Sequence, residues 1–185
     1  GALVKYREWY GCKRDAQGAF IPDVGLKLDA NQVGRGVKER DLDDKISYGV
    51  LDPAAFTADG GPSIAERMLA EGAAFRRADN KRVTERGAMG GWDQVRNRLR
   101  GDDDGRPMLF FFENCIHTIR TLPALQHDEN RPEDLDTTAE DHAADETGYA
   151  CMSRPWVPRH RELPPVHKYS ISAEGYVTAP ALPGM

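Results

Sequence analysis

The chain has 185 residues, of which 30% are charged and 39% hydrophobic, and its formal net charge is −5. This size suits one domain with a tail and is enough to bury a core. No apolar run approaches the roughly 20 residues that cross a bilayer, and the start GALVKYREWYG lacks the segments of a signal peptide. We therefore expect a soluble globular protein, and the negative charge argues against attachment to nucleic acid by overall charge.

In chain order, the sequence first predicts a strand over 2–10, a loop or hairpin over 11–25, a helix over 30–40, a strand over 46–51, a helix over 63–71 and a strand over 73–78. It then predicts a helix over 91–100, a turn over 101–107, a strand over 108–112, a helix over 113–122, an acidic linker over 126–137 and a helix over 139–151. Two helix starts carry capping-box pairs, Asp29 with Gln32 and Ser63 with Glu66.

Alternating strands and helices with short connections predict an α/β fold, a sheet with helices packed on it. We expect this domain to cover 1–153 and a proline-rich, irregular tail to cover 154–185. Apolar stripes predict that Ile64, Met68 and Leu69 face the core, as do Trp92, Val95 and Leu99.

The cysteines Cys12, Cys115 and Cys151 are scattered, and the sequence has no CxxC pair. A zinc site is therefore not expected. Reduced, partly buried thiols in a cytosolic protein are the expectation.

Asp52 directly follows the predicted strand 46–51, and ligands of open α/β sheets bind outside the carboxyl ends of strands. Its carboxylate has two interpretations. It caps the turn that Pro53 begins, which position alone favours, or it binds a metal ion at the strand end.

The predicted helix 139–151 places Asp141, His142 and Asp145 at spacings of three and four residues, so that their side chains share a face. Mg²⁺ prefers carboxylate oxygens, and Mn²⁺ also accepts an imidazole. Two such ions about 3.5–4 Å apart assist phosphodiester cleavage. The alternative is enrichment of acids in the first helical turn by the helix dipole, which explains Asp141 well and Asp145, expected in the second turn, poorly.

Charge is distributed unevenly, with a basic segment over 76–100 and an acidic one over 128–146. An enzyme that holds phosphates in one place and metal ions in another would use both, and the alternative, which charge alone favours, is two solvated faces. Four basic residues are candidate contacts to DNA phosphates, which fix position without reading sequence: Arg76, Arg77, Lys81 and Arg82. No ATP-binding GxxxxGK[ST] loop and no GxSxG serine motif is present.

The stretch 46–151 resembles the C-terminal nuclease domain of phage terminase large subunits. The matching segments are ISYGVLDPAAF, GPSIAERMLAEG, RRADNKRVTERGAMGGWDQVRNRLRG, MLFFFENCIHTIRTLPALQHD and EDLDTTAEDHAADETGY. Their order and spacing fit, and the most specific piece is Asp141-His142, two residues, Asp145 and then Tyr149.

This resemblance implies a ribonuclease-H-like mixed sheet flanked by helices and an endonuclease that uses two Mg²⁺ or Mn²⁺ ions. Asp52, Asp145 and His142 would be the catalytic, metal-binding residues, with Asp141 a less certain metal ligand. The family's first catalytic Asp lies on an upstream strand and has no equivalent in this sequence, nor does the ATPase motor. We therefore expect a fragment that lacks the first strands, has an exposed sheet edge, and is itself inactive or paired with a copy.

The sequence thus predicts a domain that cuts concatemeric viral DNA during packaging. The resemblance implies double-stranded DNA, portal protein and the small terminase subunit as partners, the host cytoplasm as location and no membrane. Two alternatives stay open. One is a non-catalytic docking module that contacts the portal or DNA, and the other is a different ribonuclease-H-like nuclease, such as a junction resolvase.

Overall fold

A computed structural model describes residues 1–157 and the backbone of 170–171 and 177–178. The helices are α1 (Ala30–Asp41), α2 (Ile64–Ala70), α3 (Gly91–Arg100), α4 (Ile116–Thr121) and α5 (His142–Ser153), with 3₁₀ turns η1 (Pro53–Phe56) and η2 (Leu122–Ala124). The strands are β1 (Leu3–Lys5), β2 (Cys12–Arg14), β3 (Phe20–Gly25), β4 (Gly49–Leu51), β5 (Phe75–Arg77), β6 (Leu109–Phe111), β7 (Ser170–Ile171) and β8 (Val177–Thr178). Within this described part, no helix is both long and apolar enough to cross a membrane.

The described strands form four two-stranded sheets. β1 lies parallel to β6, and β4 lies parallel to β5. β2 and β3 form an antiparallel hairpin, and β7 pairs antiparallel with β8. The α/β class predicted from the sequence is confirmed, and these residues show small parallel and antiparallel sheets in place of the single mixed sheet that was expected.

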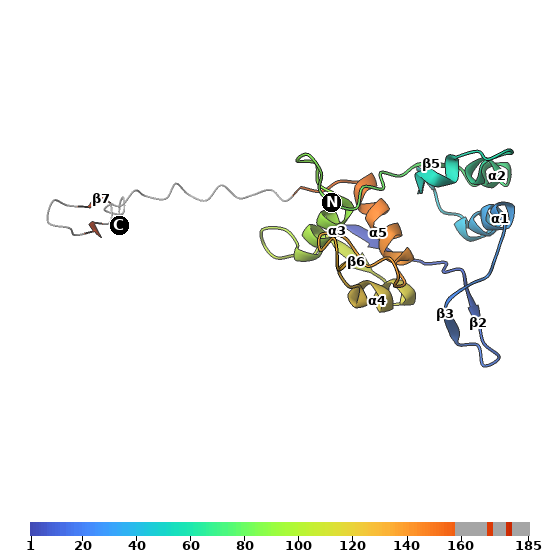
Figure 1. Cartoon of the computed structure of the whole chain (residues 1–185), viewed down its shortest axis with the longest axis horizontal. Coiled ribbons are helices and arrows are strands. Elements are labelled where there is room, and N and C mark those ends of the chain that lie inside the picture. The colour runs from blue at the N-terminus through green and yellow to red at the C-terminus, as the bar shows by residue number, and fades with distance from the viewer. Residues whose placement is uncertain (158–169, 172–176, 179–185) are drawn as a thin grey trace.

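Helices α1 and α2 pack against each other beside β5, apart from the group that α3, α4, α5 and β6 form (Figure 1). Both predicted capping boxes are present. The side chains of Asp29 and Ser63 accept hydrogen bonds from the backbone N–H groups of Gln32 and Glu66, whose side chains accept from the backbone N–H groups of Asp29 and Ser63. The buried residues of α1 are the glycines Gly34 and Gly36, and a Cβ on Gly34 would lie 2.8 Å from the Met68 Cα of α2. The missing side chain of Gly34 lets the two helices approach closely, while Gly36 makes room for the Trp9 ring.

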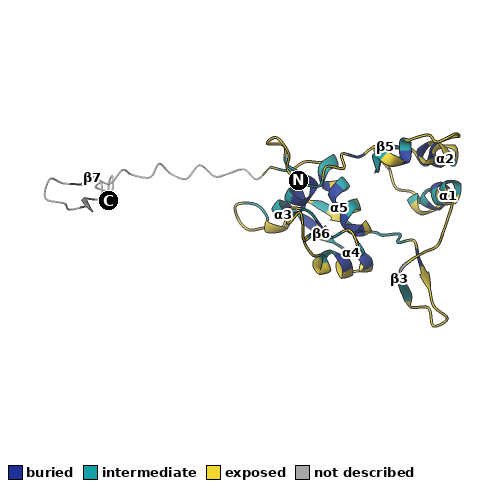
Figure 2. Cartoon of the chain, in the orientation of Figure 1, coloured by how far each residue is buried: buried dark blue, intermediate teal, exposed yellow. Residues whose placement is uncertain are grey.

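The larger group holds the main core, seen as dark blue segments around α3 and α5 in Figure 2. One cluster joins Trp92 of α3 to Leu135 and Ala144, and a second joins Val95 to Leu109 and Cys151. Helix α3 therefore packs on α5 along one part of its surface and on β6 along another.

Arg98 of α3 is almost fully buried, at 1% exposure, and its guanidinium forms hydrogen bonds with three separate segments of the chain. It donates to the carbonyl oxygens of Gly1 and Met108, each at 3.1 Å, and to that of Arg154. Burial lowers its pKa. The side chain thus ties the first residue, the start of β6 and the end of α5 to one point.

Several sequence expectations need correction. The stripe prediction was wrong for Ile64, Leu69 and Leu99, which are exposed, because α2 buries only Ala65 and Met68 and α3 uses its polar Gln94 and Arg98 toward the core.

Element boundaries also differ from those predicted. Strand 2–10 shortens to β1, and strand 46–51 to the half-buried β4. The helices predicted from 113 and 139 begin later, at Ile116 and His142. The tail predicted as irregular contains the β7–β8 pair, and most of its prolines lie outside the described residues.

Candidate functional site

Asp52 lies where β4 ends and η1 begins, and each of its carboxylate oxygens has a partner. Oδ1 accepts a hydrogen bond from the Ala54 backbone N–H at 2.7 Å, so the predicted turn cap is confirmed. Oδ2 accepts from the hydroxyl of Tyr149, one turn beyond Asp145 on α5, at 2.6 Å. The Tyr149 bond is the main cause that lowers the pKa of Asp52, while burial opposes it. The side chain therefore stays charged and is fixed toward α5.

Asp145 projects from the first turn of α5 into the same region. Its Oδ2 accepts from Nη2 of Arg82 at 2.5 Å, and the same nitrogen donates to Asp141 Oδ2 at 3.0 Å. The guanidinium thus bridges two carboxylates that like-charge repulsion would otherwise separate. Oδ1 of Asp145 is buried and has no hydrogen-bond partner among the described residues.

Electrostatics tie these groups into one cluster, which we call the acidic cluster: Asp52, Asp141, Asp145, Arg82 and Tyr149. Burial, with the negative charges of Asp141 and Asp52 adding, raises the pKa of Asp145 despite the bond from Arg82. Burial and the bond to Asp52 raise the pKa of Tyr149, which therefore remains a proton donor. Asp52 and Asp145 are 93 positions apart in the sequence, and the charge of Asp52 contributes to the raised pKa of Asp145.

His142 takes a different position from the acids. Its side chain is 81% exposed, and Nδ1 lies 3.6 Å from Asp141 Oδ1. It lines a separate hollow of about 350 Å³ between α5 and the β2–β3 hairpin, together with Trp9, Cys12 and Glu146. In the described part of the chain, no three His, Cys, Asp or Glu side chains are grouped to hold a metal ion.

The later start of α5 changes the argument about the helix dipole. With His142 as the first helical residue, Asp145 lies in the first turn and not in the second. The partial positive charge of a helix N-terminus stabilises a carboxylate there. The dipole therefore accounts for Asp145 as well as for Asp141, so helix position alone gives no sign of a catalytic role.

The four predicted phosphate contacts lie in two settings. Arg76 and Arg77 are exposed on β5, and Nη1 of Arg77 donates to the Pro53 carbonyl oxygen at 3.0 Å, one residue from Asp52. Lys81 is exposed in the connection that leads to α3. Arg82 is instead engaged in the acidic cluster, at 26% side-chain exposure. The sequence predicted that Arg82 contacts DNA phosphates and gave no sign of its two carboxylate partners, which lie 59 and 63 residues away.

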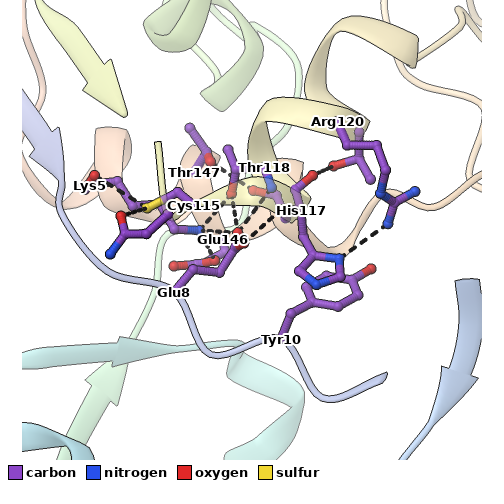
Figure 3. A network of polar contacts seen from close by, with 12 residues as sticks. Lys5, Glu8, Tyr10, Cys115, His117, Thr118, Arg120, Glu146 and Thr147 are labelled. Carbon is purple, nitrogen blue, oxygen red and sulfur yellow. Dashed lines mark hydrogen bonds and ion pairs between the residues drawn. The ribbon is translucent and has the colours of Figure 1, made fainter. Parts of the chain in front are cut away.

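A second polar network lies at the start of α4, and sequence reasoning missed it (Figure 3). The Glu8 carboxylate accepts from the backbone N–H groups of His117 and Thr118 at 2.8 and 3.0 Å, and Lys5 Nζ bonds Glu8, Thr118 and Glu146. The ring of Tyr10 stacks on His117 with 4.1 Å between centroids. The network joins β1, α4 and α5, and His117 is buried within it.

Comparison of the chain with protein-family models, with curated proteins and with solved structures gives no match.

Proposed function

We propose that this chain is a ribonuclease-H-like, metal-dependent endonuclease domain that cuts viral DNA during packaging, as part of a phage terminase. The observation that carries the proposal is the hydrogen bond that joins Asp52, at the end of β4, to Tyr149, one turn beyond Asp145 on α5. The sequence marked both Asp52 and Asp145 as candidate metal ligands for independent reasons, and a shared site is what a phosphodiester hydrolase needs.

The donor groups suit Mg²⁺ or Mn²⁺. The buried Oδ1 of Asp145 lacks a partner among the residues described, Arg82 bridges Asp145 to Asp141, and Asp52 is bonded to Tyr149 one turn along α5. Mg²⁺ typically uses one or two protein carboxylates and completes its shell with water and substrate phosphate. A bound ion would stabilise negative charge on the attacking and leaving oxygens. The exposed His142 side chain lines the separate hollow beside the β2–β3 hairpin and is not counted among these donor groups.

The protein's own side chains would have distinct tasks. Tyr149 holds Asp52 in a fixed direction. Arg82 neutralises Asp141 and Asp145 through their Oδ2 atoms, which leaves Oδ1 of Asp145 for a metal ion. Arg76, Arg77 and Lys81 are exposed and would attract the phosphates of the substrate.

The decisive experiment is calorimetric titration of Mn²⁺ into the parent protein, Asp145→Ala and Asp104→Ala. Asp104 is a matched control, because it pairs with an arginine, Arg106, in an exposed turn. We expect binding to the parent and to Asp104→Ala, and loss of binding in Asp145→Ala. Equal binding by all three proteins would contradict the metal site.

A docking module without catalysis is the second candidate, and the ion pairs of Arg82 favour it, because they satisfy Asp141 and Asp145 without a metal ion. Absence of Mn²⁺ binding in every protein would support that candidate. Cleavage of a plasmid with Mn²⁺, lost in Asp52→Ala, would support the endonuclease, and preference for four-way junctions over linear duplex would indicate a resolvase.

A further inference from the structure

Two guanidinium groups gather around Tyr48, the residue just before β4. The Arg76 guanidinium lies over the tyrosine ring, 3.6 Å from its centroid, and that of Arg154 lies 5.3 Å from the same centroid. Nε of Arg154 also donates to the Tyr48 hydroxyl at 2.6 Å. The aromatic ring and hydroxyl hold both cations, from β5 and from the end of α5, in fixed positions.

This positive charge is not neutralised within the described residues. Neither Arg76 nor Arg154 forms an ion pair with a carboxylate there, in contrast to Arg82, Arg106 and Arg120. Both arginines are exposed, so each head group is accessible from solvent. Holding like charges near one ring costs electrostatic free energy, which an anion placed between them would offset.

The register of β4 and β5 connects this pair with the acidic cluster. Arg76 lies opposite Val50 and Arg77 opposite Leu51, so Arg77 is level with the end of the strand that Asp52 follows. The Arg77 guanidinium lies 4.9 Å from the centre of the Phe56 ring and donates to the Pro53 carbonyl. Side chains alternate along a strand, so Arg76 shares the sheet face of Val50 and Tyr48, and Arg77 points to the other face. The strand that carries Tyr48 ends at Asp52, which connects the Arg76 face with the acidic cluster.

We propose that Tyr48, Arg76 and Arg154 form a phosphate clamp, which binds the sugar-phosphate backbone of the nucleic acid beside the acidic cluster. The proposal rests on the proposed function and deepens it, because it gives the substrate a path over β4 and β5. A planar guanidinium bonds two phosphate oxygens at once, and stacking on an aromatic ring fixes its orientation. Neither Tyr48 nor Arg154 is part of the acidic cluster, so the clamp acts in binding and not in bond cleavage.

The test is fluorescence anisotropy with a labelled DNA duplex in EDTA, so that metal binding and cleavage do not contribute. The parent, Arg76→Ala, Arg154→Ala, Tyr48→Phe and the control Arg106→Ala are titrated at salt concentrations from roughly 50 to 200 mM. Substitution of either clamp arginine should reduce the magnitude of the negative slope of log K against log salt by about 1, because one phosphate contact is lost. Arg106→Ala should keep the parent slope, since Arg106 pairs with Asp104.

Tyr48→Phe keeps the ring under Arg76 and removes the hydroxyl that Arg154 bonds, so its affinity should fall less than that of Arg154→Ala. Circular dichroism checks that each variant is folded. Slopes equal to the parent in both arginine variants, or no DNA binding by the parent, would overturn the clamp. Reduced slopes without Mn²⁺-dependent cleavage would support the clamp and refute the endonuclease. A single strand of the same sequence shows whether the clamp prefers duplex or unpaired DNA.

Discussion

At the scale of single residues, the hydroxyl of Tyr149 connects the last helix to Asp52. Its hydrogen bond is the first cause of the lowered pKa of Asp52. In Tyr149→Phe we therefore expect the pKa of Asp52 to rise toward its ordinary value, with a loss of about 1 kcal/mol in the free energy of unfolding. Carboxyl-carbon NMR titration measures the first effect and urea denaturation the second.

Tyr6→Phe is the matched control, because the hydroxyl of Tyr6 donates to Asp44 at the same distance, 2.6 Å, elsewhere on the molecule. It should leave the pKa of Asp52 as in the parent. An unchanged Asp52 pKa in Tyr149→Phe would show that the hydroxyl does not orient this carboxylate.

The candidate site was predictable in part. Asp52 was found from its place directly after an apolar run, and Asp145 from its helical spacing with Asp141 and His142. The bridge of Arg82 could not be found, because local sequence does not encode a contact across 63 residues. For the same reason, His142 was grouped with the acids, although its side chain lies in solvent beside the β2–β3 hairpin.

At the scale of elements, the contact between α1 and α2 depends on a glycine. Alanine in place of a helical glycine usually stabilises a helix by about 0.5–1 kcal/mol. At Gly34, however, the new Cβ would lie 2.8 Å from the Met68 Cα, so backbone atoms must shift. We expect Gly34→Ala to lower the free energy of unfolding by about 1–3 kcal/mol.

Gly148 of α5 provides the control, because an added Cβ there meets nothing within 4 Å. Gly148→Ala should raise the free energy of unfolding by about 0.5–1 kcal/mol. Urea denaturation of both variants distinguishes the two cases, and a stabilising Gly34→Ala would mean that α1 and α2 are less closely packed than described.

The elements themselves were mostly predicted, because their signals are local. The capping boxes of Asp29 and Ser63 lie within four residues and were confirmed as written. The buried face of α1 was missed, because Gly34 has no apolar side chain that would mark a packing surface in the sequence. Pairing of β1 with β6 joins residues more than 100 positions apart, so sheet topology was beyond local patterns.

At the scale of the whole molecule, Glu140 links distant segments through charge. Hydrogen bonds from Arg120, with a further one from Tyr10, lower the pKa of Glu140 to about 2, while burial opposes the shift. The unfolded chain has the ordinary value near 4.5 and binds the proton first as pH falls. The stability from Glu140 is therefore complete above pH 4.5 and is lost as pH falls toward about 2.

We expect Glu140→Gln to be less stable than the parent at neutral pH and to lose less stability across that acid range. Denaturation with urea at several pH values measures both effects. Glu129→Gln, at an exposed position of the same acidic segment, should follow the parent. Parallel pH curves for the parent and Glu140→Gln would contradict the assigned role. The raised pKa of Asp145 affects stability with the opposite sign, but Asp145 is present in every protein compared, so it does not change the difference between the curves.

The reactivity of the three buried thiols can report how often their surroundings open locally. Cys12, Cys115 and Cys151 are free and buried, and they lie in β2, just before α4 and in α5. Burial also raises the pKa of Cys115, and that of Cys151 to about 11. An alkylating reagent reacts with each thiol only while its surroundings are open. Mass spectrometry of the three peptides over time would therefore rank the hairpin, the α4 start and α5 by how often each one opens.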